Sequence, residues 1–134
     1  MIMNKFQNKI AKLSKNYHNV IVAGSAFGSI QDLLEICDTV FVVADKPPSI
    51  KAKNLVYRQS FSGSEHLPTI DFLFFDLSTT HLLEQAIPAM GKHRPLVLIE
   101  GANVIGRDIS GPLYNSHYNA VHQDKHFHVW KSNQ

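Results

Sequence analysis

A run of four apolar residues, Val20 to Ala23, leads directly into two glycines that lie four positions apart, Gly24 and Gly28. Four consecutive apolar residues are typical of a strand that is covered on both faces, and glycine permits backbone angles and close approaches that a side chain would block. A helix is predicted to follow, with Ser29 as its N-cap and an apolar face that begins at Ile30. This unit either offers free backbone N–H groups to an anionic or nucleotide ligand or simply packs a helix closely on its strand.

Further apolar runs continue an alternating order of strands and helices along the chain. Strands are predicted at residues 39–44, 54–59, 70–76 and 95–99, and helices at residues 4–17, at 29–38 and between a cap at 78–80 and Gly91. The alternation favours a parallel sheet. The connections on both sides of 54–59 are short for crossover helices, so either a compressed turn serves there or the strand pairing differs.

The C-terminal part of the chain has a different pattern. Beyond a glycine-bearing loop at 101–111, the segments 118–122 and 126–131 alternate well enough to predict an antiparallel hairpin that turns at 123–125. The predicted fold class is therefore α/β, a doubly wound and mostly parallel sheet with an antiparallel C-terminal hairpin. A chain of 134 residues is expected to form a single domain, residues 1–134.

The charge of the chain is nearly balanced, with 13 Lys and Arg against 11 Asp and Glu and a formal net charge of +2. This balance does not indicate nucleic-acid binding, and the four lysines at positions 5, 9, 12 and 15 are typical of the solvated face of an amphipathic helix. No run approaches the ~20 apolar residues that span a bilayer. The lone cysteine, Cys37, is expected to be buried in a reduced compartment. We therefore expect a cytoplasmic protein without nucleic-acid or membrane partners.

Three acidic residues, Asp45, Asp76 and Glu100, directly follow or end predicted strands. The carboxyl ends of parallel strands meet at one edge of a sheet, which is where open α/β sheets bind ligands. Each acid also has an ordinary structural use. Asp45 precedes two prolines and suits a turn, Asp76 suits the N-terminus of a helix, and Glu100 either acts as a base or solvates its loop.

The order of these elements, from Val20 to Lys131, resembles the Rossmann-like fold of the class I S-adenosylmethionine-dependent methyltransferases. In that family the first strand carries an acid and a G-x-G-x-G turn that holds the methionine part of the cofactor. Gly24 and Gly28 match the first and third glycines, whereas Val22 replaces the acid and Ala26 replaces the middle glycine.

The resemblance implies a role for each candidate site residue. Gly24, Ser25, Gly28 and Asp45 would bind S-adenosylmethionine, with Asp45 accepting hydrogen bonds from the ribose hydroxyls. Asp76 would lie next to the methyl acceptor as the catalytic residue, because methyl transfer depends mainly on alignment and needs at most a nearby base. The remaining residues would contact the substrate, a small molecule: Ser78, Thr79 and Glu100.

Two other functional classes compete with the enzyme hypothesis. A non-catalytic binding or assembly module, in the form of a homo-oligomer, is suggested by Val22, by Ala26 and by the short crossovers. A nicotinamide-dependent oxidoreductase is disfavoured because the glycines do not have the G-x-G-x-x-G spacing. No metal site is predicted, because the C-terminal histidines lack the spacing of known metal motifs: His117, His122, His126 and His128.

Overall fold

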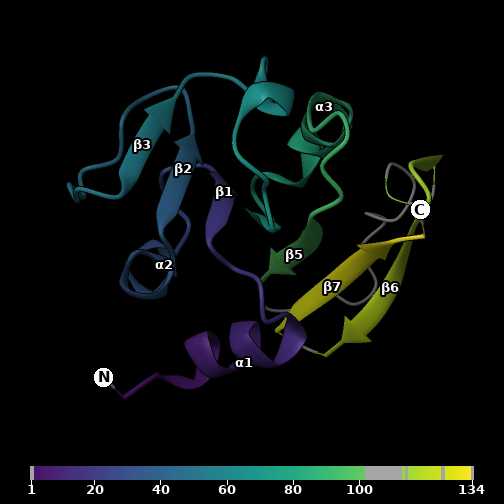
Figure 1. The fold of residues 1–134 in the computed structure, drawn as a ribbon, viewed down its shortest axis with the longest axis horizontal. Coiled ribbons are helices and arrows are strands. Elements are labelled where there is room, and N and C mark those ends of the chain that lie inside the picture. The colour runs from purple at the N-terminus through teal and green to yellow at the C-terminus, as the bar shows by residue number, and fades with distance from the viewer. Residues whose placement is uncertain (1, 102–112, 114, 125, 134) are drawn as a thin grey trace.

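The computed structural model describes residues 2–101, 113, 115–124 and 126–133. Its strands are β1 (Asn19–Ala23), β2 (Thr39–Val43), β3 (Leu55–Arg58), β4 (Phe72–Asp76), β5 (Leu96–Glu100), β6 (Tyr118–Gln123) and β7 (Phe127–Ser132). These described strands form one sheet in the order β3-β2-β1-β4-β5-β7-β6 (Figure 1). Strands β1 to β5 pair in parallel, and β7 runs antiparallel to both β5 and β6. The predicted fold class and the C-terminal hairpin are confirmed; the loop predicted at 101–111 lies, beyond Gly101, outside the described residues.

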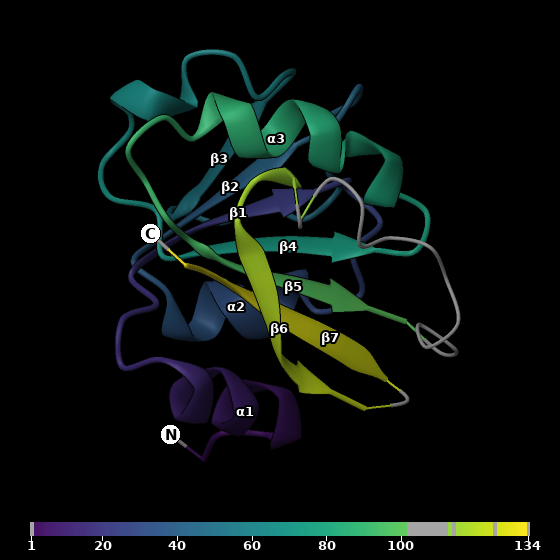
Figure 2. The same cartoon turned by 90° about the vertical axis from the view of Figure 1, so that its right-hand side faces the viewer.

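Helices cover both faces of the sheet (Figure 2). The α-helices are α1 (Lys5–Leu13), α2 (Ile30–Ile36) and α3 (Leu83–Ala89), and two short 3-10 turns are η1 (Ser64–His66) and η2 (Thr80–Leu82). Helices α1 and α2 share one apolar cluster with alternate residues of the sheet, and α3 packs into a second cluster on the opposite face. No helix of the described part is both long and apolar enough to cross a membrane.

Helix α1 is shorter than predicted, because it ends at Leu13 rather than near residue 17. Ser14 has an extended backbone, and its hydroxyl accepts a hydrogen bond from the Asn16 N–H at 3.0 Å. A serine that satisfies the local backbone in this way competes with continuation of the helix. The N-terminus of α1 is well capped, since Asn4 and Gln7 exchange hydrogen bonds in a capping box.

The two short crossovers use compressed connections rather than a different pairing. Residues 44–54 join β2 to β3 without a helix, and only η1 interrupts the segment between β3 and β4. The strands on either side of these connections pair in parallel within the same sheet, β3 with β2 and β4 with β1.

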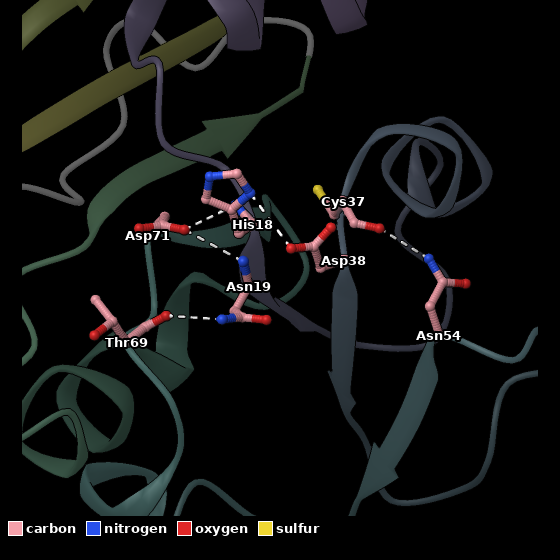
Figure 3. Close-up of polar contacts among 7 residues, drawn as sticks. All are labelled: His18, Asn19, Cys37, Asp38, Asn54, Thr69 and Asp71. Carbon is pink, nitrogen blue, oxygen red and sulfur yellow. Dashed lines mark hydrogen bonds and ion pairs between the residues drawn. The ribbon is translucent and has the colours of Figure 1, made fainter.

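Polar contacts fix the amino-terminal edge of the sheet (Figure 3). One carboxylate oxygen of Asp71 accepts hydrogen bonds from the N–H groups of His18 and Asn19 at 2.8 and 3.2 Å, which ties the start of β1 to the start of β4. The Asn54 amide donates to two carbonyl oxygens at the end of α2, those of Leu34 and Cys37, each at 2.9 Å. These contacts leave the carboxyl edge, at the opposite end of the strands, as the place where the connecting loops can form a site.

Cys37 is buried at this amino-terminal edge, as the sequence predicted. Burial, together with the negative charges of Asp38 and Asp71, raises the pKa of its thiol to about 12. A thiol with so high a pKa is a poor nucleophile.

Candidate functional site

A cavity of about 510 Å³ opens at the carboxyl ends of β1, β2, β3 and β4. A volume of this size suits a small-molecule or cofactor ligand. The structure brings six of the predicted site residues together in its lining: Gly24, Ser25, Asp45, Asp76, Ser78 and Thr79. These residues come from three different connections, and the parallel topology is what places them at one edge.

Gly24 is held in a conformation and a contact that favour glycine. Its φ is +94°, its N–H donates to the Val43 carbonyl at 2.8 Å, and a Cβ added to it would lie 2.9 Å from Cγ2 of Thr79. The turn after β1 therefore lies directly against the loop after β4, and both line the same cavity.

We expect Gly24→Ala to destabilise the protein by about 1–3 kcal/mol, because left-handed strain costs ~1–2 kcal/mol and the contact with Thr79 adds to it. Urea unfolding measures the loss. Gly28→Ala is the matched control, since its Cβ would meet Glu100 at an ordinary 3.9 Å and its φ is not positive. Equal destabilisation by the two substitutions would contradict the strain at Gly24.

Asp76 and Thr79 form a closed turn after β4. The Asp76 N–H donates to the Thr79 hydroxyl at 3.1 Å, and Oδ1 of Asp76 accepts from the Ser78 N–H at 2.8 Å and from the Ser78 hydroxyl. The predicted side-chain cap of the third helix is wrong, because the Thr79 hydroxyl serves this turn and η2 precedes α3. The turn instead fixes the position of the Asp76 carboxylate at the cavity wall.

Asp45 lies at the end of β2 with an exposed side chain that lines the cavity. Its carboxylate makes no hydrogen bond or ion pair with any residue of the described part, so it does not stabilise the turn before the two prolines. An unpartnered carboxylate is free to accept hydrogen bonds from a ligand.

Sequence reasoning missed several polar residues in the same cavity: Lys46, Gln59, Ser60, His81 and Gln85. Gln59 and Ser60 follow β3, so the rule that ligands bind beyond the carboxyl ends of parallel strands could have found them. His81 and Gln85 lie on η2 and α3, and only the placement of these turns beside the cavity brings them to it.

Gly28 and Glu100 do not line this cavity. Glu100 lines a second cavity of about 540 Å³, between α1, the end of β5 and the turn of the hairpin. The Ser29 hydroxyl donates to Glu100 Oε2 at 3.1 Å and makes no cap hydrogen bond to α2, so its predicted capping role is wrong. Gly28 lies close to the Glu100 carboxylate, so it is on the side of the Gly24–Ser29 turn that faces the second cavity.

Burial raises the pKa of Glu100, and the charges of Asp76 and Asp32 raise it further, whereas the Ser29 hydrogen bond lowers it. A carboxyl group with a higher pKa in the folded state binds more protons there than in the unfolded state. The contribution of Glu100 to the stability of the protein therefore falls as the pH rises from the unfolded pKa, about 4.3, through the folded pKa.

We expect Glu100→Gln to flatten the decrease in stability between about pH 4 and the folded pKa of this group, because the amide stays neutral. Urea unfolding at a series of pH values measures the effect on the free energy of unfolding. The variant should gain stability over the native protein on the alkaline side of the window. An unchanged pH profile would show that Glu100 titrates normally.

Val22, at the position of the family's acid, is fully buried between the sheet and the α1–α2 layer. It does not line the cavity, whereas Ala26 does. Any ligand in the cavity therefore meets no charge from this position of β1.

The C-terminal histidines do not converge on a metal site in the described part of the chain, where no group of three His, Cys, Asp or Glu side chains is suitably placed. His122 contacts the carboxylate of Asp124 at 2.8 Å. The alternating pattern of this hairpin predicts a half-exposed polar face for its histidines, and this prediction is wrong for His128, which is buried.

No protein-family model matches the sequence, and no curated protein is significantly similar to it. Solved structures do match the fold. The N-methyltransferase NodS from Bradyrhizobium japonicum WM9 superposes with a TM-score of 0.61 at 13% identity, covering 97% of this chain and 96% of that one. NodS has also been solved in complex with S-adenosyl-L-homocysteine, and that structure matches with the same TM-score of 0.61 at 12% identity, over 97% of this chain and 87% of that one.

Other matching structures are named for a different reaction or a different substrate. Precorrin 8W decarboxylase of Methanobacterium thermoautotrophicum has a TM-score of 0.61 at 10% identity, covering 100% of this chain and 97% of that one. An rRNA methylase from Streptococcus thermophilus has a TM-score of 0.53 at 13% identity, covering 100% of this chain and 99% of that one. Identities this low show the fold and not the substrate. The chain has the fold of the class I S-adenosylmethionine-dependent methyltransferases, as the order of its strands and helices predicted.

Proposed function

We propose that the protein binds S-adenosylmethionine in the cavity at the carboxyl ends of β1 to β4 and transfers its methyl group to a small molecule. One observation carries the proposal: the carboxylate of Asp45, which has no partner among the described residues, lines the same cavity as the Gly24 turn and Asp76. The two solved structures of NodS, one of them in complex with S-adenosyl-L-homocysteine, support a ligand of this class.

The residues of the cavity fit such a cofactor. Asp45 supplies acceptors for a ribose diol, and the amide and hydroxyl groups of Gln59 and Ser60 suit the polar edge of a nucleobase. Phe61 adds an apolar surface, and the Gly24 backbone lies close to the lining, since a side chain there would meet Thr79. When bound, the cofactor supplies an electrophilic methyl group.

The chain's own contribution is mainly alignment. The turn that links Asp76, Ser78 and Thr79 holds the Asp76 carboxylate at the cavity wall, where it can orient a nucleophile and accept its proton. His81 lines the same cavity and is exposed, so it is a second group able to accept a proton there.

Thermal unfolding with and without ligand tests the proposal. S-adenosylmethionine and S-adenosyl-L-homocysteine should both raise the melting temperature, whereas the reduced nicotinamide dinucleotide should not. The absence of any shift at millimolar concentrations of both adenosyl compounds would contradict it.

A non-catalytic binding or assembly module is the second candidate, and the core position of Val22 favours it. If the family's acid is replaced by a core side chain, the cofactor's methionine end loses a charged partner. Light scattering and a methyl-transfer assay separate the candidates. A stable oligomer that binds no adenosyl compound and transfers no methyl group would favour the module, and a ligand-binding monomer would favour the enzyme.

A further inference from the structure

The second cavity, about 540 Å³ in volume, lies on the other side of the Gly24–Ser29 turn. Helix α1 and the start of β7 lie side by side there (Figures 1 and 2), and Lys9 Nζ lies 5.1 Å from the centre of the Phe127 ring. The floor is aromatic, because Phe6 and Phe127 both line it. Charged side chains of both signs line the same cavity around these two rings.

The negative side of the second cavity is Glu100. Its carboxylate is half-buried, hydrogen-bonded to Ser29 and without an ion pair among the described residues. Asp124 also lines the cavity, but its oxygens are already engaged by the N–H groups of His126 and Phe127 and by the His122 ring. Glu100 is therefore the acceptor that remains available to a ligand.

The positive side of the second cavity is formed by Lys5 and Lys9, which lie one turn apart on α1 and both line it. Neither ammonium group has an ion pair with another residue of the described part. The sequence pattern assigned these lysines to a solvated helix face. Lys5 is indeed exposed and Lys9 is partly exposed. The structure adds that these two of the four N-terminal lysines line a cavity together with two aromatic rings and the Glu100 carboxylate.

We propose that this cavity binds a small amino-carboxylate, a molecule with an ammonium group at one end and a carboxylate at the other, joined by a flat apolar part. Glu100 receives the ammonium group, Lys5 and Lys9 receive the carboxylate, and the rings of Phe6 and Phe127 contact the part between them. Both charged ends then acquire partners that have no ion pair among the described residues, and the two aromatic rings favour an apolar linker.

The position of Glu100 connects this cavity to the proposed function. Glu100 pairs in register with Asp76 on β4 and with Phe127 on β7, so the three side chains belong to neighbouring strands. Asp76 lines the first cavity and Glu100 the second. The amino end of the bound molecule is thereby placed on the strand next to that of Asp76, across the Gly24–Ser29 turn from the first cavity. The inference that this molecule is the methyl acceptor rests on the proposed function, and it requires the ammonium group to lose a proton first, for which its partner Glu100 is an acceptor.

Titration with para-aminomethylbenzoate, followed by backbone amide NMR shifts, tests the site. The probe should bind saturably, with shifts at the residues that line the second cavity. Benzylamine lacks the carboxylate and para-methylbenzoate lacks the amine, so each should bind at least about tenfold more weakly, the loss expected for one charge-assisted contact.

Variants of the protein test which residues bind the amine and which bind the carboxylate of the probe. Glu100→Gln, and Lys5→Gln combined with Lys9→Gln, should each weaken binding of the full probe by at least about tenfold. Lys12→Gln is the matched control on the same helix, because Lys12 is exposed and does not line the cavity. Asp45→Ala, in the first cavity, should leave the affinity for the probe unchanged.

A parallel titration with S-adenosyl-L-homocysteine separates this inference from the proposed function. If that compound binds and the probe gives no saturable shift, or shifts only elsewhere, the inference is wrong and the proposed function is unaffected. Equal binding of benzylamine and the full probe would also overturn it. If the probe binds as expected and the adenosyl compound does not, the amino-carboxylate site is supported and its assignment to a methyl acceptor is wrong.

Discussion

Asp45→Ala is expected to remove most of the thermal stabilisation that S-adenosyl-L-homocysteine gives to the native protein. At a ligand concentration of a hundred times Kd, binding adds about 2.7 kcal/mol to the free energy of unfolding. Hydrogen bonds to a charged acceptor contribute about 1.5–3 kcal/mol, so the substitution should weaken binding about 10- to 100-fold. The stabilisation at the same ligand concentration then falls to about 0.4–1.4 kcal/mol.

The control for this experiment is Asp38→Ala. Asp38 lies just before the opposite end of β2, where it contacts His18 at 3.4 Å on the surface. Loss of this exposed pair should change stability by at most about 1 kcal/mol and leave ligand stabilisation intact. A ligand-induced shift that survives in Asp45→Ala would mean that the carboxylate does not bind the ribose.

Phe74→Ala is expected to cost about 3–5 kcal/mol of stability, the largest effect of any substitution considered for the fold. Phe74 lies in β4, between β1 and β5, and is 0% exposed. Its ring packs against three others, those of Phe6, Phe27 and Phe72, with centroids 5.3 to 6.1 Å apart. Truncation leaves a cavity between the sheet and α1 that these rings cannot close.

Urea unfolding measures this loss, and Val121→Ala is the control. Val121 lies on the edge strand β6 and is 54% exposed, so its truncation should change stability by less than about 1 kcal/mol. Similar destabilisation by the two variants would contradict the placement of β4 at the centre of the sheet.

The positions of the strands and the mostly parallel sheet could be predicted because apolar runs such as Phe72 to Phe75 are buried on both faces, as is typical where helices cover a parallel sheet. The ends of the elements were harder to predict. Ser14 stops α1 by bonding to its own neighbours, and Ser29 and Thr79 were assigned as caps from residue type alone. Each hydroxyl has several possible partners nearby, and tertiary structure selects one of them.

In the candidate site, too, some residues could be predicted from the positions of the strands, and others depend on tertiary packing. Asp45 and Asp76 could be assigned to one cavity because they sit at the ends of parallel strands, which share an edge. Glu100 also ends a strand, but the Gly24–Ser29 turn separates it from them, and no sequence pattern shows on which side of a turn a side chain will lie. Lys5 and Lys9 could not be assigned to a site, because the packing of α1 beside β7 depends on contacts between distant segments.

The most direct test of the central claim is a titration of the native protein with S-adenosyl-L-homocysteine, followed residue by residue through backbone amide NMR shifts. Binding should be saturable, with the largest shifts around the first cavity, at Gly24, Asp45, Phe61 and Thr79. No saturable change at millimolar ligand, or changes confined to other parts of the sheet, would contradict it.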